Sequence, residues 1–354
     1  MKILIAGDWH SDLHEEELCK SFKRFGHQVV PFKWSQYFSH NKSTLAWLTA
    51  ITDRIQNKFL FGPTVHRINR DFIKITIRSK PDIIFIYRGT HIYANTIREL
   101  KRALPSCKIL SYNNDDPFSE AQPKYYWRHF LKSVPEYDFI FAYREKNIDE
   151  FKVSGAKEVS LLRSWYVPDR SFHLELDAYD KQKFSCDVVF AGHYEPDGRL
   201  EMLEDIVSKA YSLRLFGPTK YWSNPLKISR ILRDFEPVQM AWGNDYNKAL
   251  CGSKIALCFL SKLNRDTYTR RCFEIPATKT FLLSEYSDDL ASLYKEGVEA
   301  EFFRNRLEMM EKIKFYLENP EARVRIANAG YYKAINSGYD IDSRLKKLLL
   351  EIQQ

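Results

Sequence analysis

The 354-residue chain contains no C-x-x-C pair, and none of its histidines stands at zinc-site spacing from a cysteine. Its cysteines are scattered among apolar neighbours, which favours buried free thiols over disulfides or metal ligands. We therefore expect no metal site among them. The six cysteines are Cys19, Cys107, Cys186, Cys251, Cys258 and Cys272.

Long hydrophobic runs are also missing. The first residues, MKILIAGDWH, lack the apolar core of a signal peptide. The longest apolar runs, DIIFIY and IALCFL, are far shorter than the ~20 residues that cross a bilayer. These absences predict a cytoplasmic protein.

Nucleic-acid motifs are absent too, because no helix-turn-helix, zinc-finger or RNP pattern appears. Lys and Arg number 54 against 46 Asp and Glu, a net charge of +8 that favours anionic partners without naming one. We expect no nucleic-acid partner. What the chain does have is a 44% hydrophobic composition and a length typical of two globular domains.

Each half alternates short β-branched or aromatic runs with longer helical stretches, the pattern of a parallel sheet covered by helices. In the first half, strands are predicted within 2–7, 26–32, 80–89, 107–116 and 137–144, with a helix near 13–25. In the second half, strands are predicted within 186–195, 213–217, 254–260 and 280–285, with helices near 197–210 and 307–317.

The polar stretch 169–185 is interpreted as a linker between these halves. The predicted fold is therefore α/β, with two doubly wound, Rossmann-like domains at 1–168 and 186–340 that face each other across a ligand cleft. The last segment, 341–354, is predicted to be a helix that could close the second domain or cross back onto the first.

Residues 41–80 interrupt the first domain with two helical stretches that carry eight Lys or Arg against two Asp. A basic amphipathic insertion of this kind could touch a membrane surface or an anionic acceptor. Packing of its apolar face on the sheet is the simpler interpretation. That face is formed by Leu45, Leu48, Ile51, Ile55 and Phe59.

Chemistry-bearing residues gather in 266–285, DTYTRRCFEIPATKTFLLSE. Pro276 allows only a short helix here, with Thr267 or Thr269 as its N-cap. The backbone amides at the start of this helix could hold a phosphate together with Arg270 and Arg271. The carboxylates of Asp266 and Glu274 would repel a phosphate, so hydroxyl groups are their expected partners. A ligand with a central diphosphate and a sugar ring at each end satisfies this set.

Asp266-x7-Glu274, followed by IPATKTFLLSE, YKEGVEAEFF and YLENPEARVRIANAGYYKAINSGY, resembles the C-terminal domain of group 1 glycosyltransferases, in the branch similar to the spore-maturation protein CgeB. The resemblance covers about residues 186–349. It extends more loosely to AGDW, GHQVVPF, KPDIIFIYRG and YNNDDP. It implies a GT-B fold and a nucleotide-sugar donor as substrate, with no cofactor and no bound metal.

The resemblance also implies roles for residues of the second half. Glu274 would bind the nucleotide ribose, and Asp266 would contact the donor sugar. The diphosphate would be neutralised by Arg199 and Arg271. Gly192 would allow the backbone to approach the donor closely. Thr269, at the start of the short helix, completes the donor-binding set.

Two positions depart from the family pattern. Asp266 replaces the usual glutamate with a shorter side chain, and Lys279 stands where glycine is common. These departures leave the identity of the donor, and activity itself, open.

In the first half, Asp115 and Asp116 follow a predicted strand, in YNNDDPF. We interpret them as ligands of acceptor hydroxyls, with Asp116 as a possible base. Acids that form a turn or cap a helix before Pro117 are the main alternative, and a metal site is a third. Arg88, at the end of another strand, either meets an acceptor or pairs with Asp115 or Asp116.

The segment GDWHSD follows the first strand. Gly7 allows a tight turn there, and Trp9 and His10 would line the cleft. His10 could act as a base or as an orienting donor because its pKa lies near neutrality, and a purely structural histidine is the alternative.

Together these observations predict a glycosyltransferase that moves a sugar from a nucleotide diphospho-sugar to a hydroxyl of a glycan, protein or small molecule, with retention of configuration. Two other functions fit the same fold. One is a nucleotide-sugar epimerase, and the other is a non-catalytic carbohydrate-binding or coat-associated protein.

Overall fold

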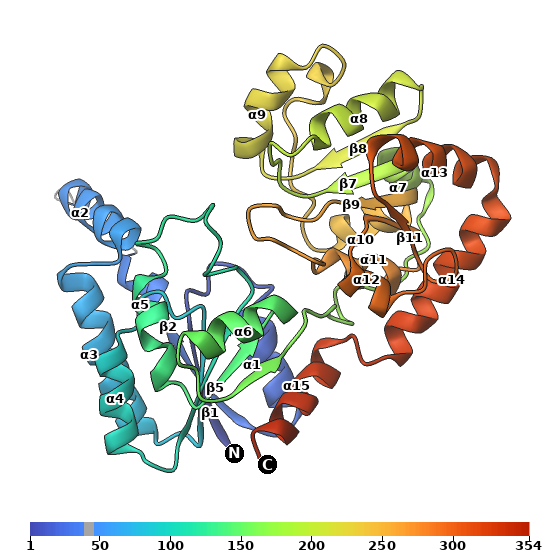
Figure 1. Ribbon diagram of the computed structural model, residues 1–354. Coiled ribbons are helices and arrows are strands. Elements are labelled where there is room, and N and C mark those ends of the chain that lie inside the picture. The colour runs from blue at the N-terminus through green and yellow to red at the C-terminus, as the bar shows by residue number, and fades with distance from the viewer. Residues whose placement is uncertain (39–45, 354) are drawn as a thin grey trace. The chain divides into compact units, whose positions relative to one another are not determined.

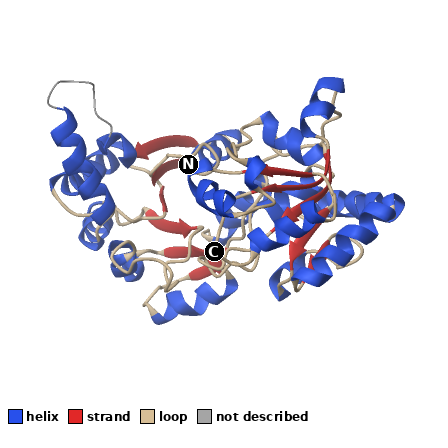
Figure 2. Ribbon diagram, turned by 90° about the horizontal axis from the view of Figure 1, so that it is seen from above, coloured by secondary structure: helices blue, strands red, loops and turns tan. Residues whose placement is uncertain are grey.

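The computed structural model describes residues 1–38 and 46–353. The chain forms two compact units (Figure 1), one made of Met1–Arg163 with Arg344–Gln354 and the other of Ser164–Ser343. Each unit is built on a parallel sheet whose strands are flanked by helices (Figure 2). The predicted α/β class, with two parallel sheets, is confirmed.

The first unit contains a six-stranded sheet in the order β2-β1-β3-β4-β5-β6, with every neighbouring pair parallel. The central strand β3, IIFIY, is buried at every position, because a parallel sheet covered on both faces needs apolar side chains on both. The strands are β1 (Lys2–Gly7), β2 (Gln28–Lys33), β3 (Ile83–Tyr87), β4 (Lys108–Asn113), β5 (Phe139–Ala142) and β6 (Val159–Leu161).

Helices α1 to α6 and two short 3-10 segments connect these strands. The last helix of the chain, α15, lies beside α1 (Figure 1), with Lys346 Nζ 5.5 Å from the centre of the Phe25 ring. The bounds are α1 (Glu15–Arg24), η1 (Trp34–Phe38), α2 (Ala46–Phe59), α3 (Pro63–Ser79), α4 (Ala94–Ala103), α5 (Arg128–Ser133), η2 (Val134–Glu136), α6 (Glu145–Val153) and α15 (Ile341–Glu351).

The second unit contains a five-stranded parallel sheet in the order β11-β10-β9-β7-β8. Its strands are β7 (Cys186–Ala191), β8 (Leu213–Phe216), β9 (Ser253–Cys258), β10 (Leu282–Glu285) and β11 (Glu301–Phe303). Its helices are α7 (Ala178–Phe184), α8 (Arg199–Ser208), α9 (Thr219–Ile228), η3 (Arg233–Phe235), α10 (Asn244–Cys251), α11 (Arg271–Ala277), α12 (Asp288–Leu293), α13 (Arg306–Glu318) and α14 (Pro320–Asn336).

The strands predicted from the sequence are confirmed, to within a few residues at their ends. The segment predicted as a linker, 169–185, lies instead inside the second unit and includes helix α7. It is held there by polar contacts, because Asn247 donates to the carbonyl of Phe172 at 2.7 Å and Lys248 pairs with Asp180 at 2.9 Å. The break between the units falls at Ser164 and again at Arg344.

The basic insertion forms α2 and α3, but the apolar face predicted on α2 does not pack as the simpler interpretation expected. Ile51, Ile55 and Phe59 are 46%, 53% and 44% exposed. The side chains of Leu45 and Leu48 lie outside the described residues. Within the part of the chain that the structure describes, no helix combines the length and the apolar character needed to cross a membrane.

All six cysteines are free, and five are buried, as expected from their apolar neighbours; Cys251 is partly buried. Two of them, Cys258 and Cys272, lie with their sulfur atoms 3.6 Å apart.

Lys279, at the position where the resemblance implied glycine, ends the turn after α11 with a φ of 62°. A residue with a Cβ is strained in this left-handed conformation, and Lys279 is exposed, so its side chain gains little packing in return. The position thus requires the backbone geometry of glycine even though the residue is lysine.

We expect Lys279→Gly to stabilise the protein by about 0.5–1 kcal/mol, since relief of the strain exceeds the extra chain entropy of glycine in the unfolded state. Urea unfolding would measure the change. Lys279→Ala is the matched control, because it removes the charge and keeps the Cβ. An equal gain in both variants would contradict the explanation from backbone strain.

Candidate functional site

In each sheet, the order in which the strands follow one another reverses at one point. Ligands of open α/β sheets bind at the carboxyl ends of the two strands that flank such a reversal. In the first unit the reversal lies between β1 and β3, and in the second it lies between β7 and β9. Of the residues selected from the sequence, Gly7 ends β1, Trp9 and His10 follow it, Arg88 follows β3 and Gly192 follows β7.

Arg271 is the central charged residue at the reversal in the second unit. A Cβ added to Gly192, just after β7, would lie 3.3 Å from Arg271 Nη1 and 2.8 Å from the ring of Phe190. The missing side chain of Gly192 therefore leaves room for the guanidinium. Arg271 Nε is buried and has no hydrogen-bond partner among the described residues.

Glu274 lies one helical turn beyond Arg271 and is only 9% exposed. Its Oε2 accepts a hydrogen bond of 3.0 Å from the hydroxyl of Tyr246, and its Oε1 lies 3.9 Å from Arg270 Nε. Burial raises the pKa of Glu274, while the Arg270 charge and the Tyr246 bond act in the opposite direction. The carboxylate thus has polar neighbours without a close ion pair.

Asp266 and Thr269 both lie in the loop between β9 and α11. The amide of Asp266 donates to the carbonyl of Ser261 at 2.8 Å. Thr269 is buried, and its hydroxyl contacts the sulfur atom of Cys258 at 3.3 Å, so its side chain secures the loop and not a ligand. The predicted capping role also differs: α11 begins after Arg270, with no side-chain cap bond.

Arg199 does not have the position that the resemblance implied. It is 3% exposed, and it forms two hydrogen bonds to Asp197, from Nε at 2.8 Å and from Nη2 at 2.6 Å. A third goes from its Nη1 to the carbonyl of His193 at 2.5 Å. These nearby acceptors occupy the guanidinium, so Arg199 fixes the loop after β7 and we remove it from the donor-binding set.

In the first unit, Arg88 pairs with Asp115, Nη2 to Oδ2, at 2.8 Å. This contact decides between the alternatives that the sequence left open for Arg88. Asp116 differs from the expected base because it is completely buried. Its carboxylate accepts from the amide of Phe118 and from Asn147 Nδ2, both at 3.0 Å, which is the turn-forming role weighed as its alternative.

Glu15, at the start of α1, was not selected from the sequence, yet it lies at the reversal between β1 and β3. A Cβ on Gly7 would lie 2.1 Å from Glu15 Oε1, and the same oxygen accepts from the amide of Trp9 at 3.1 Å. Glu15 is 2% exposed, and among the described residues its Oε2 has no hydrogen-bond partner. Burial raises the pKa of Glu15, against the effect of the Trp9 bond.

His10 is exposed, not buried as a structural histidine would be. Its Nδ1 lies 3.4 Å from Asp8 Oδ2, and this hydrogen bond raises the pKa of His10. Trp9 has a φ of 57°, and Lys33 Nζ lies 4.4 Å from the centre of its ring. The segment after β1 thus presents an acid and a histidine side by side.

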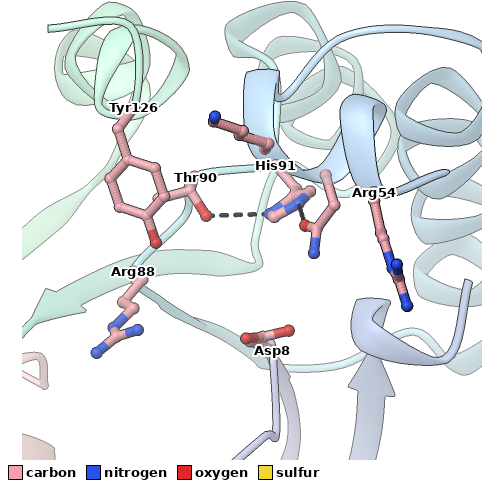
Figure 3. A pocket seen from close by; sticks show the side chains of 8 residues that line it. Asp8, Arg54, Arg88, Thr90, His91 and Tyr126 are labelled. Carbon is pink, nitrogen blue, oxygen red and sulfur yellow. Dashed lines mark hydrogen bonds between the residues drawn. The ribbon is translucent and has the colours of Figure 1, made fainter. Parts of the chain in front are cut away.

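A cavity of about 320 Å³ lies at the same edge (Figure 3). Asp8 and Arg88 come from the ends of β1 and β3, and Arg54 comes from α2 (Figure 3). No sequence pattern indicated that α2 would lie at this strand end, although Arg54 and Lys58 are four residues apart on one helix. The lining residues are Asp8, Arg54, Asn57, Lys58, Arg88, Thr90, His91 and Tyr126.

Comparison with known proteins places these features in a familiar fold. Residues 199–350 match a protein family described as Glycosyl transferase-like. None of the curated proteins matches the chain significantly.

Several solved structures match over the full length. HepE from Anabaena, in complex with UDP and glucose, is 12% identical with a TM-score of 0.67, covering 100% of this chain and 99% of that one. Sucrose-phosphate synthase from Thermosynechococcus elongatus is 11% identical, with a TM-score of 0.71 and coverage of 100% and 98%. The α,α-trehalose 6-phosphate synthase from Burkholderia multivorans is 13% identical, with a TM-score of 0.65 and coverage of 100% and 98%.

These similarities define the class of the fold. The chain has the GT-B architecture of two Rossmann-like α/β units, as predicted. The match to the Glycosyl transferase-like family lies mostly in the second unit, where Arg271 and Glu274 are found.

We expect Glu15→Gln to remove a pH-dependent loss of stability. Because the folded-state pKa of Glu15 lies above its ordinary value of 4.5, the native state binds more protons than the unfolded state above that pH. Wild-type stability relative to Glu15→Gln should therefore fall as the pH rises from about 4.5 through the folded-state pKa. Urea unfolding at pH 4, 6 and 8 measures this difference.

The neighbouring substitution Glu16→Gln is the control, since the Glu16 side chain is 46% exposed. A stability difference between wild type and Glu15→Gln that does not change with pH would contradict the assignment of a buried, ionisable Glu15.

Proposed function

We propose that the protein is a glycosyltransferase that uses a nucleotide diphospho-sugar donor. One observation carries this proposal: at the reversal between β7 and β9, the partly buried side chain of Arg271 lies beside Gly192, and its buried Nε is unpartnered among the described residues. A partly buried cation with a buried, unused donor suits a diphosphate, and Arg presents a fork of N–H groups to phosphate oxygens. Glu274 is one turn away for a hydroxyl.

In this proposal Arg271 binds the diphosphate and stabilises the charge that develops on it as the glycosidic bond breaks. Glu274 accepts hydrogen bonds from the ribose, and Asp266 contacts the donor sugar. No metal is required, because Arg271 supplies the charge. Retention of configuration and membership of the CgeB-like branch belong to the proposal, as does a cytoplasmic location.

The acceptor binds, in this proposal, at the edge of the first sheet. Asp8 and His10 stand together there, and Asp115 is held by Arg88. His10 remains a candidate base, and Asp116 is replaced in this role by Asp8, which is not buried and is paired with a histidine. Asp8 accepts a hydroxyl proton or orients the hydroxyl through His10.

The direct test is incubation with UDP-, GDP-, TDP- and ADP-sugars, with and without an acceptor mixture, and measurement of the nucleoside diphosphate released. UDP-glucose is the first choice, since HepE, with the same fold, has been solved with UDP and glucose. Release supports a transferase. Conversion of the sugar without release would indicate the epimerase, and binding without any turnover would indicate the non-catalytic protein.

We expect Glu274→Ala to weaken nucleotide binding by about 1.5–3 kcal/mol, since a charge-assisted hydrogen bond to the ribose is lost. Calorimetry with UDP and the other nucleoside diphosphates measures it. The control is Glu321→Ala, which removes an exposed acid from α14. Equal affinities of wild type and Glu274→Ala would remove Glu274 from the ribose site.

The exposed apolar side chains of α2 support peripheral membrane contact through the 41–80 insertion as a further part of the proposal. We expect Ile51→Ser with Ile55→Ser to reduce co-sedimentation with anionic vesicles, because two side chains that would enter the lipid interface become polar. Val153→Ser, at a 90% exposed position on α6, is the matched control. Undiminished sedimentation of the double variant would exclude contact through this face of α2.

A further inference from the structure

The cavity in the first unit has two chemically different sides (Figure 3). Asp8 lies between Arg88 and Arg54 in this view, and the hydroxyl of Tyr126 points toward the same space as Arg88. The strand ends therefore supply acidic and hydroxyl groups, while α2 supplies cations. A ligand that fits both sides must carry hydroxyl groups at one end and negative charge at the other.

The positive charge of the cavity comes chiefly from α2. Arg88 is neutralised by Asp115 at 2.8 Å. Arg54 and Lys58 line the cavity, and neither forms an ion pair with another described residue. As like charges four residues apart on one helix they repel each other, and an anion placed between them would relieve this repulsion.

A hydrogen-bonded chain of uncharged side chains, formed by Thr90, His91 and Asn57, connects the two sides of the cavity. His91 Nε2 lies 2.9 Å from Asn57 Oδ1, and the Thr90 hydroxyl lies 3.0 Å from His91 Nδ1. Because an amide oxygen only accepts, Nε2 carries the proton and Nδ1 accepts from Thr90. Burial lowers the pKa of His91 to about 4, so this ring adds no charge. The Asn57 amide group is left with its N–H donors for a ligand.

We propose that this cavity binds a phosphate monoester carried by a polyol acceptor. Arg54 and Lys58 hold the phosphate with the Asn57 amide, and Asp8 accepts a hydrogen bond from a hydroxyl of the same molecule. The identity of the ligand as an acceptor rests on the proposed function, whereas the phosphate site does not.

The cavity volume fits this ligand class. About 320 Å³ is within the lower part of the range of roughly 300–1,000 Å³ found for small-molecule sites. A phosphate monoester on a polyol comes from two sources, a soluble sugar phosphate or the phosphorylated inositol headgroup of a lipid. Both present the same group to Arg54 and Lys58.

The test measures binding of glucose 6-phosphate by calorimetry at low ionic strength, with glucose as the neutral comparison. The lipid arm measures, by sedimentation, binding of phosphatidylcholine vesicles with and without phosphatidylinositol 4-phosphate, whose headgroup carries both a phosphate monoester and free hydroxyl groups. The variant is Arg54→Gln with Lys58→Gln. The control is Lys74→Gln, which removes an exposed cation from α3.

We expect glucose 6-phosphate to bind the wild type, and the double variant to bind it at least about tenfold more weakly, as loss of charge-assisted contacts implies. The control should bind as the wild type does. Sedimentation that depends on phosphatidylinositol 4-phosphate and is lost in the double variant, without binding of glucose 6-phosphate, would assign the site to a lipid headgroup and also support the proposal.

Equal binding by the wild type and the double variant would overturn the proposal, and so would the absence of binding to both phosphate probes. Nucleoside diphosphate release from the donor sugars in the presence of the acceptor mixture, measured in the same variants, separates this result from the proposed function. A failed phosphate site with normal release leaves the transferase intact. Phosphate binding without any release leaves the site intact and refutes the transferase.

Discussion

A charged group with little access to water at the end of a strand needs either a partner or a ligand. In the first unit of this protein that group is negative, and in the second unit it is positive. In each unit the strand next to the reversal leads into a glycine whose missing side chain makes room for a charged residue. Gly7 is covered by the carboxylate of Glu15, and Gly192 lies against the guanidinium of Arg271. In both cases one polar atom is left unpartnered among the described residues.

In the proposed function, this arrangement assigns a donor that is rich in negative charge to the second unit and an acceptor that offers hydroxyl groups to the first. A parallel sheet brings the carboxyl ends of its strands to one edge, so loops that are distant in sequence meet there. In the second unit that edge carries Arg271 with Glu274. In the first it carries Asp8 with His10 and the paired Arg88 and Asp115.

The predictions from the sequence were accurate where periodicity or strand ends decided the outcome. Residues placed after strands, such as Arg88 and Arg271, lie where parallel topology put them. Predictions for Arg199 and Asp116 did not hold, for one shared reason: each has nearer partners that use its polar atoms. Competition between a ligand and an internal partner depends on side-chain direction and distance, which spacing does not specify. Glu15 was not selected from the sequence because it stands at the start of a helix, and only the fold places its carboxylate over Gly7 at the end of β1.

The sequence by itself determined two parallel α/β units, the positions of their strands and the short helix that carries Arg271 and Glu274, because buried parallel strands and a proline-limited helix leave clear local patterns. Only the tertiary structure decided which charges remain available to a ligand. It assigned Arg199 to its own loop, paired Arg88 with Asp115, and brought Arg54 and Lys58 from the insertion to the end of β1. These outcomes depend on contacts between segments far apart in the chain, and local patterns hold no information on such distances.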